Sequence, residues 1–478
     1  MLTGTGTAGA YHAGVLRALR EAGVKIDLVA GRGIGAVGAI FTAVDGGAPL
    51  WDATGVWRTA ATRSLYGWRG TLRASAAALL VALVALLLPL TALGGAVIVY
   101  PIGFLLRLLG SDAGNALATG YTTLVDLIFQ PSALPLFLPR FVMLTLVVLL
   151  GILVVGEILP RVRTPTRRRA RGPAWWRLIG APLDVTRATN HFSSGLWKIM
   201  RGAARITKPT PDDLAERYAE FLSENLEQPE FRELIVTVHD LDARRDLVFA
   251  LLQEPFRRPF FARRLGAEGG HRHLETMDLA GSARRHAVDA LVGPLSLPVA
   301  TDSHLVRFAT ESGWRGETHH VCDRPEATTR LLEEVANAGA EQVIVVSALP
   351  QPQGPHTLES NRRDARGRAG DHLVALETAA LRDALAAWGR RFQAVFHVQP
   401  EHNPLGPFDF AGGYDERSDR RFPLSELVDR GREDGFRQFV DPVVGASGEW
   451  IEPRRTGVRL GATAASIDDA PAISETES

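Results

Sequence analysis

The chain has 478 residues, enough to bury a large core and to form more than one structural unit. Its 53 lysines and arginines balance 53 aspartates and glutamates, so net charge gives no reason to expect a nucleic-acid partner. The single cysteine, Cys322, excludes an internal disulfide framework and cysteine-based zinc sites, and it fits a reducing compartment.

The first 45 residues contain a glycine-rich loop and a tight turn. The loop is followed by a predicted helix over 13–19, and Gly23 ends that helix before a short predicted strand over 26–30. The next segment has the spacing of a nucleophile elbow, Gly-x-Ser-x-Gly, in which serine occupies a sharp strand-to-helix turn. Its central position is Gly33, which has no oxygen to attack an ester. The loop comprises Gly4, Thr5, Gly6, Thr7, Ala8 and Gly9, and the elbow glycines are Gly31, Gly33 and Gly35.

A dinucleotide-binding turn is the competing interpretation of the glycine loop. Asp27 lies at a suitable distance for a ribose ligand, but that motif needs a full strand before the loop, and only Met1 to Thr3 precede it. The short first strand suggests the hypothesis that a few upstream residues belong to the protein, which mass spectrometry of the intact native chain would test. The sequence predicts no N-terminal signal peptide, because Met1 leads directly into the loop.

Residues 4–45 resemble the patatin-like phospholipase family, through the glycine loop, the GVLRAL helix and the segment GVKIDLVAG before the elbow. Weaker similarity extends over 234–242, 292–298 and 333–346. The resemblance implies an α/β fold, a patatin-like three-layer α/β/α domain, in which the loop supplies backbone N–H donors for an oxyanion. It also implies a Ser–Asp dyad, in which the carboxylate takes the serine proton.

By this resemblance, neither position of the dyad carries the residue that the family has there. The nucleophile position is Gly33, and the acid position aligns with Arg315, followed by the family's glycine at Gly316. The register is open by a residue or two, so Glu317 stays a candidate base, whereas Asp323 is interpreted as part of a helix start. We therefore expect no intact catalytic residues.

Hydropathy predicts a membrane insertion. Residues 74–106 carry no charge, and a helix of that length would measure roughly 50 Å against a hydrocarbon core of about 30 Å. We predict a spanning helix over 75–93, breaks at Gly94-Gly95 and Pro101, and a second span over 141–155. Arginines flank both ends of this region, which predicts that both flanks face the cytoplasm and that the chain crosses two or four times. These arginines are Arg58, Arg63, Arg69 and Arg73 before it and Arg161, Arg163, Arg167, Arg168, Arg169, Arg171 and Arg177 after it.

The predicted organisation has six parts. A first part of the patatin-like domain over 1–73 is followed by a transmembrane insertion over 74–160 and a basic juxtamembrane segment over 161–204. The domain resumes over 205–350, continues in a C-terminal extension over 351–466, and ends in a disordered tail over 467–478. We expect helices over 211–226 and 373–388 and a strand over 392–398.

Other constellations give weaker signals. His271 and His273 could bind a metal, but the sequence shows no third ligand near them, so a solvated loop is favoured. The pair His319-His320 is interpreted in the same way. The glycine-rich segment 408–415 is interpreted as an ordinary loop, with a cover over the site as the alternative. We expect no cofactor and no metal.

The expected function has two forms. One is a membrane-anchored pseudoenzyme of the lipid acyl hydrolase class, on the cytoplasmic side of the inner or plasma membrane, that binds phospholipid or a fatty acyl ligand or scaffolds a protein partner. The other is an active phospholipase or esterase that uses an unrecognised nucleophile.

Overall fold

The computed structural model describes residues 1–129, 137–163, 180–262, 272–351 and 365–445, and it divides into two compact units. Unit 1 comprises Met1–Gly67 and Asp184–Ser478, and unit 2 comprises Trp68–Leu183. Unit 2 contains the predicted insertion over 74–160 and extends beyond it at both ends, so unit 1 resumes at Asp184 rather than at the predicted residue 205. The arginines between 164 and 177, His271 and the predicted tail over 467–478 lie outside the described residues.

Unit 1 is built on a nine-stranded, mostly parallel sheet. Its central strands run parallel, β6 is antiparallel to β5, and the β8–β9 hairpin joins the sheet through β5. In spatial order the strands are β11 (Ala394–Val398), β10 (Gln342–Ser347), β1 (Leu2–Thr3), β2 (Leu28–Arg32), β5 (Glu233–Asp240), β6 (Arg245–Leu251) and β7 (Thr276–Asp278), with β8 (His304–Arg307) and β9 (Thr318–Cys322) off this path.

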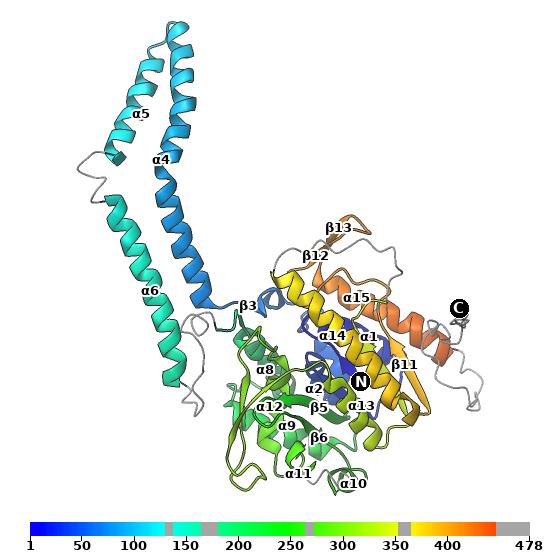
Figure 1. The fold of residues 1–478 in the computed structure, drawn as a ribbon. Helices are drawn as coiled ribbons and strands as arrows, with labels where there is room; N and C mark the ends of the chain where they lie inside the picture. Colours follow the sequence, from blue (N-terminus) through cyan, green and yellow to red (C-terminus); the bar gives the residue numbers. More distant parts are fainter. Residues whose placement is uncertain (130–136, 164–179, 263–271, 352–364, 446–478) are drawn as a thin grey trace, which may run out of the picture. The chain divides into compact units, whose positions relative to one another are not determined.

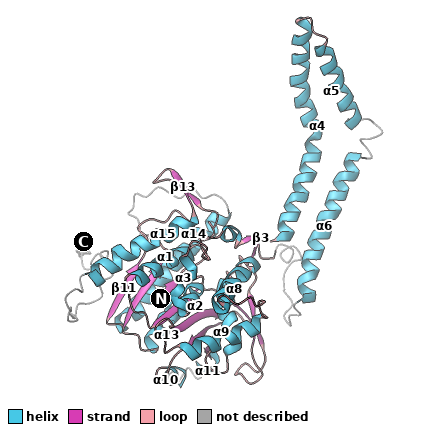
Figure 2. Cartoon of the chain, turned by 180° about the vertical axis from the view of Figure 1, so that it is seen from behind, coloured by secondary structure: helices cyan, strands magenta, loops and turns pink. Residues whose placement is uncertain are grey.

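Helices cover both faces of this sheet, as Figures 1 and 2 show. One face packs against α13 (Ala327–Asn337) and α14 (Ala365–Trp388), around a core that includes Ile235, Val345 and Leu381. The opposite layer comprises α1 (Ala8–Glu21), α2 (Gly35–Ala43), α9 (Pro211–Asn225) and α12 (Ala287–Val292), with α15 (Leu424–Gly435) packed on α1. This is an α/β architecture with a central sheet between two helical layers.

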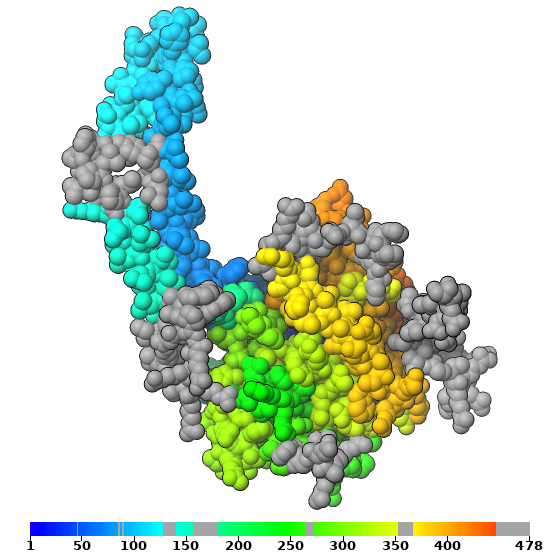
Figure 3. Space-filling view, in the orientation of Figure 1, coloured from blue at the N-terminus to red at the C-terminus, as the bar shows by residue number. Residues whose placement is uncertain are grey.

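The predicted C-terminal extension is an integral part of unit 1. It supplies the edge strand β11, and Figure 3 shows its yellow and orange segments forming much of the visible face of this unit. Helix α15 approaches α1 closely through glycines on both helices. A Cβ at Gly14 would lie 1.9 Å from the Val428 carbonyl oxygen, and one at Gly431 would lie 2.3 Å from that of Tyr11. The two helices therefore pack with their backbones in contact.

Shorter elements complete unit 1 and the connections to unit 2. The strands β3 and β4 pair with each other, as do β12 and β13, the latter antiparallel. The bounds are η1 (Asp45–Gly47), α3 (Ala48–Trp51), η2 (Ala60–Ser64), β3 (Gly67–Trp68), β4 (Leu183–Asp184), α8 (Thr186–Arg201), α10 (Arg257–Ala262), α11 (Arg272–Glu275), η3 (Arg284–His286), η4 (Gly293–Leu295), η5 (Gly389–Arg391), β12 (Gly413–Asp415), β13 (Arg420–Phe422) and the π-helix η6 (Phe436–Val444).

Unit 2 is a helical hairpin in which α4 (Gly70–Leu108) lies against α5 (Ala113–Phe129) and α6 (Phe137–Arg163). The predicted breaks at Gly94-Gly95 and Pro101 are wrong, because α4 is continuous over 39 residues. Proline has a φ compatible with a helix, and long apolar helices tolerate both its missing donor and its clash with the carbonyl four residues earlier. The glycines serve packing instead: Gly95 lies against the Tyr121 ring, and Gly103 faces the Gly114 carbonyl.

The helices of unit 2 expose apolar side chains. Val97, Phe104 and Leu108 on α4 are 68, 62 and 71% exposed, and Leu150 on α6 is 61% exposed. Among the described residues, Leu90–Leu108 is long and apolar enough to cross a membrane, whereas Gly70–Val84 and Arg140–Val155 are shorter apolar helices. The qualifying span thus lies further along α4 than the predicted 75–93. Exposed apolar surface of this extent is uncommon on a protein surrounded by water.

Candidate functional site

The glycines after β2 form a tight strand-to-helix turn, as the elbow spacing predicts. Gly33 has a φ of +55°, and α2 begins two residues later. A Cβ at Gly31 would lie 2.3 Å from the Gly35 carbonyl oxygen, and one at Gly35 would lie 2.2 Å from that of Leu2. The outer glycines are therefore required by close backbone contacts, and the turn has the shape of an elbow.

Asp323, rather than Arg315, faces the centre of the elbow. A Cβ at Gly33 would lie 2.8 Å from Asp323 Oδ2 and 2.5 Å from the Gly4 carbonyl oxygen. Arg315 instead occupies an exposed turn between β8 and β9, with a φ of +48° and its N–H bonded to the Ser312 carbonyl. The assignment of the acid position to Arg315 is thus wrong for this geometry.

Strand pairing explains how Asp323 arrives there. Strand β5 pairs with β6 along one edge and with β2 along the other, but β2 ends where Arg32 pairs with Thr237. Strand β9 takes over that second edge and runs antiparallel to β5, so that Cys322 lies opposite His239. Asp323, the residue after Cys322, therefore lies directly beyond the end of β2.

Arg32 holds Asp323 in a buried ion pair. The Arg32 side chain is 1% exposed, and its Nη1 donates to both carboxylate oxygens of Asp323, at 3.1 and 2.9 Å. Its Nη2 donates to Glu377 Oε1 on α14 at 3.1 Å, and its Nε donates to Thr328 Oγ1 at 2.7 Å. One guanidinium therefore links the end of β2 to Asp323 after β9 and to α13 and α14, the two helices of one layer.

The electrostatics of this cluster are dominated by burial. Burial raises the pKa of Asp323 and of Glu377, although the charge of Arg32 acts in the opposite direction on both carboxyls. Two carboxylates share a single guanidinium, so full ionisation would leave one net negative charge out of contact with water. Burial also raises the pKa of Tyr66, and the charge of Asp323 adds to that effect.

The glycine loop has its own partners. The Thr7 N–H donates to the Pro407 carbonyl at 3.0 Å, and the Thr7 hydroxyl donates to the Gly406 carbonyl at 2.9 Å. At the elbow, the N–H of Ile34 donates to the Gly4 carbonyl at 3.0 Å. Oxyanion stabilisation needs free donors aimed at the developing charge. These two backbone N–H groups, one in the loop and one after the nucleophile position, already have acceptors.

The segment around Pro407 covers the loop. Phe410, which follows it, is buried and stacks on Tyr66 with ring centroids 5.4 Å apart. The contacts with the glycine loop thus come from Gly406 and Pro407, just before the segment 408–415, while Phe410 within that segment packs on Tyr66. A cavity of about 200 Å³ remains beside the loop, lined by Thr5, Glu377, Asp371 and Pro407 among others. The Thr5 hydroxyl contacts both Glu377 and, at 3.4 Å, Asp323.

The histidines of the β8–β9 hairpin form carboxylate pairs away from the elbow. His319 Nδ1 lies 2.5 Å from Asp240 Oδ2, and its Nε2 lies 3.1 Å from Glu317 Oε2. Glu317, the other candidate base, is thus engaged with a histidine. The neighbouring His320 Nδ1 contacts Asp242 at 2.9 Å. Among the described residues there is no group of three or more such side chains that could hold a metal ion.

His319 predicts a pH-dependent contribution to stability. Burial alone would lower its pKa, but the hydrogen bonds with Asp240 and Glu317 outweigh burial and raise the pKa above its ordinary value. The stabilisation is therefore complete below the unfolded pKa of about 6.5 and is lost as pH rises through the folded value. We expect His319→Gln to lose more stability at pH 5.5 than at pH 8.5 in denaturation experiments. The exposed His372→Gln control should show no such difference, and an equal loss at both pH values would contradict the assignment.

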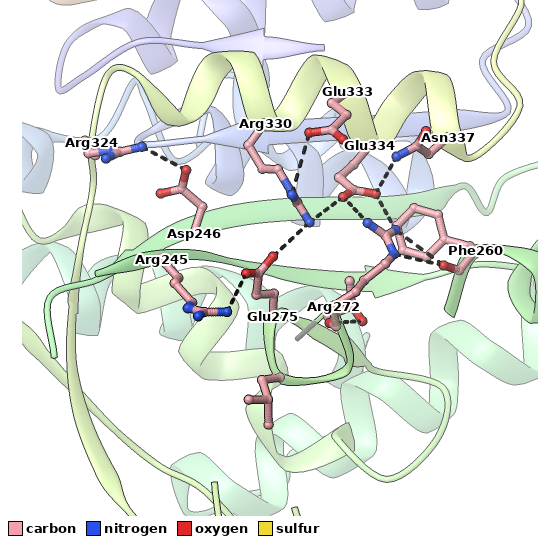
Figure 4. A network of polar contacts seen from close by, with 12 residues as sticks. Arg245, Asp246, Phe260, Arg272, Glu275, Arg324, Arg330, Glu333, Glu334 and Asn337 are labelled. Atoms are coloured by element: carbon pink, nitrogen blue, oxygen red, sulfur yellow. Dashed lines mark hydrogen bonds and ion pairs between the residues drawn. The ribbon is translucent and has the colours of Figure 1, made fainter. Parts of the chain in front are cut away.

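A second buried polar network lies where α13 packs against the sheet (Figure 4). Arg272 forms a two-pronged ion pair with Glu334, with both N–O distances at 2.6 Å, and its guanidinium lies over the Phe260 ring. Arg330 links Glu334 to Glu275 at 2.8 and 3.2 Å. Arg272, the middle residue of the predicted 271–273 histidine segment, therefore has a structural role in fixing α13.

Sequence reasoning located the elbow and the loop, but it missed Arg32, Glu377 and the role of Asp323. A cation between two glycines at the end of an apolar strand is a usable signal, because a buried arginine needs a carboxylate partner. Comparison with models of protein families gave no match to the chain, and comparison with curated protein sequences gave none either.

Proposed function

We propose that this protein is a membrane-anchored, patatin-like member of the lipid acyl hydrolase class that has lost catalysis and binds lipid or scaffolds a partner at the cytoplasmic membrane surface. The observation that carries the proposal is the ion pair between Arg32 and Asp323 beside Gly33. Arg32, which precedes the nucleophile position, forms an ion pair with Asp323, the carboxylate that would act as base.

Each requirement of acyl transfer bears on this proposal. A nucleophile needs an oxygen or sulfur atom, and Gly33 has neither. A base must accept the proton of the nucleophile, whereas the charge of Arg32 and its hydrogen bonds to both oxygens favour the ionised form of Asp323 and oppose that transfer. An oxyanion needs unpaired donors, but the N–H groups of Ile34 and Thr7 have acceptors within the protein. The arrangement supports a binding site better than a catalytic one.

The membrane part of the proposal is supported by unit 2. A helical hairpin whose apolar side chains stay exposed would leave much apolar area in water, at a cost of about 25 cal/mol per Å². A bilayer removes that cost. The arginines on both flanks of the hairpin favour a cytoplasmic position for unit 1.

The test is an acyl hydrolase assay on the purified full-length chain, combined with labelling by a fluorophosphonate probe. We expect no turnover of phospholipid or short-chain ester above the buffer rate and no stoichiometric labelling, with an active serine lipase as positive control. Labelling of one residue per chain, or turnover that disappears when the protein is boiled, would refute the pseudoenzyme.

An active hydrolase is the second candidate, and one contact favours it. The Thr5 hydroxyl bonds to Glu377 beside the 200 Å³ cavity. In such a pair the Thr5 oxygen would attack the ester carbon, Glu377 would take the hydroxyl proton, and that proton would pass to the departing alcohol oxygen. A water that gives a proton to Glu377 would then attack the acyl carbon, and that proton would return to the Thr5 oxygen as the fatty acid leaves. The pairing of Glu377 with Arg32 opposes this role. Activity that Thr5→Val abolishes would favour this candidate over the pseudoenzyme.

A further inference from the structure

Unit 1 contains a second, larger cavity outside the elbow region. Its volume is about 680 Å³, and it lies between α8 and the segment from Pro49 to Leu65. Its polar lining includes Arg187, Asn190, His191, Ser194 and Lys198 from α8, with Asp52 on the opposite wall. Both walls belong to unit 1.

The charges around this cavity are almost all positive. Within the described residues, neither Arg187 nor Lys198 has a carboxylate within ion-pair distance, and both are exposed. The stretch 185–210 contains five cations and no acid, and 53–73 contains four arginines and no acid. Asp52 is the single acidic residue in the lining. An anion in the cavity would therefore meet two cations that have no internal partner.

The polar groups in the lining suit an oxyanion. His191 Nε2 lies 3.1 Å from the Val56 carbonyl oxygen, so this contact joins α8 to the opposite wall of the cavity. The Ser194 hydroxyl oxygen accepts from Lys208 at 3.3 Å, which leaves its own hydrogen available to a ligand. Lys208 adds a third cation at Ser194. Arginine, lysine and hydroxyl donors together are the usual partners of phosphate oxygens.

The position of the cavity along the chain favours a lipid as the source of the phosphate. Leu65, which lines it, precedes unit 2 by two intervening residues, and Arg187 follows the end of unit 2 by four positions. The first apolar helix, α4, thus begins five residues after Leu65, whereas the last, α6, ends 24 residues before Arg187. We propose that this cavity binds the phosphate-bearing headgroup of an anionic phospholipid, an inference that rests on the membrane anchoring proposed above.

The test uses the full-length protein in neutral detergent and dihexanoyl phosphatidic acid, a water-soluble probe, with binding measured by calorimetry. Removing two cations that contact a lipid phosphate costs about 1 kcal/mol each, so Arg187→Gln/Lys198→Gln should weaken binding about thirtyfold. The matched control is Arg201→Gln/Arg205→Gln, which removes the same charge from exposed positions that do not line the cavity. We expect the control to change the affinity less than twofold. Thermal melting of both variants should match that of the wild type.

Two further arms separate the sources of the anion. Dihexanoyl phosphatidylcholine and inorganic phosphate should bind at least tenfold more weakly than the phosphatidic acid. If both double variants bound the phosphatidic acid equally weakly, the affinity would depend on overall charge alone, which would contradict a site in this cavity. Inorganic phosphate that binds as tightly as the lipid, or no binding of phosphatidic acid at all, would also overturn it. The soluble probe needs no anchoring and no hydrolysis, so failure here is distinguishable from failure of the proposed function.

Discussion

Replacement of Arg32 by methionine is expected to lower the free energy of unfolding by about 3–5 kcal/mol at pH 7.5, which would be the largest effect of any single substitution described here. The side chain is 1% exposed and compensates two carboxylates that are themselves 2 and 5% exposed. Without it, Asp323 and Glu377 keep their burial and lose their cation. Chemical denaturation in a non-denaturing detergent measures the loss.

The pH dependence of the Arg32→Met variant has a definite sign. Burial already raises the pKa of both carboxyls, and removal of the guanidinium takes away the charge that opposes the rise. A carboxyl whose folded pKa is raised binds its proton more tightly in the folded state, so stability falls as pH rises above the unfolded pKa of about 4. The variant should therefore be least destabilised near pH 5 and most destabilised near pH 8. Adding Glu377→Gln should recover part of the loss at pH 8.

Arg58 provides the matched control for this experiment. It also pairs with an aspartate, Asp429, but the two side chains are 22 and 51% exposed. Pairs in contact with water contribute about 0–1 kcal/mol, so Arg58→Met should cost little and should show no such trend with pH. If Arg32→Met lowered the free energy of unfolding no more than Arg58→Met, Arg32 would not stabilise the two carboxylates, and it could not be the cause of inactivation.

Replacement of Gly33 by serine is expected to yield no hydrolase and a less stable protein. A left-handed φ costs a residue other than glycine about 1–3 kcal/mol, and the new Cβ would also lie 2.5 Å from the Gly4 carbonyl oxygen. Even a serine accommodated there would face a carboxylate held by Arg32. Phospholipid hydrolysis and thermal melting of Gly33→Ser are the measurements.

Gly33→Ala separates the two parts of that expectation. It adds the same Cβ without a hydroxyl, so its loss of stability should match that of Gly33→Ser within about 1 kcal/mol. Robust hydrolysis by Gly33→Ser alone would mean that Asp323 acts as a base in spite of Arg32. Hydrolysis by Gly33→Ser that appears only with Arg32→Thr and Glu377→Gln would instead identify the guanidinium as the cause of inactivation.

Periodic and capped elements were predictable from the sequence. The helix expected over 211–226 is observed as Pro211–Asn225, where the Thr210 hydroxyl oxygen accepts from the Asp213 N–H. The helix expected over 373–388 ends at Trp388 as predicted but begins eight residues earlier, at Ala365. The strand expected over 26–30 lies two residues later, at Leu28–Arg32, because Arg32 continues the pairing with β5. The local hydrophobic pattern marks an element well, but long-range pairing sets its boundary.

The arrangement around Gly33 was only partly predictable, because its members come from distant parts of the chain. Arg32 and Asp323 are 291 residues apart, and Arg32 and Glu377 are 345 apart. The resemblance pointed to Arg315 because Gly316 follows it, as a glycine follows the aspartate in the family motif, whereas the position of Asp323 depends on the edge of β5 along which β9 runs. No local pattern specifies that edge.

The insertion of unit 2 between β2 and β5 also orders events during synthesis. Strands β1 and β2 leave the ribosome first, but their partners β5 and β10 begin only at Glu233 and Gln342. The apolar helices emerge in between and can enter a bilayer while the first 67 residues still lack most of their sheet. Arg32 has no carboxylate partner until Asp323 has been translated. The N-terminal segment must therefore wait as an incomplete half-domain, and at 5–20 residues per second that wait lasts roughly 15–60 s.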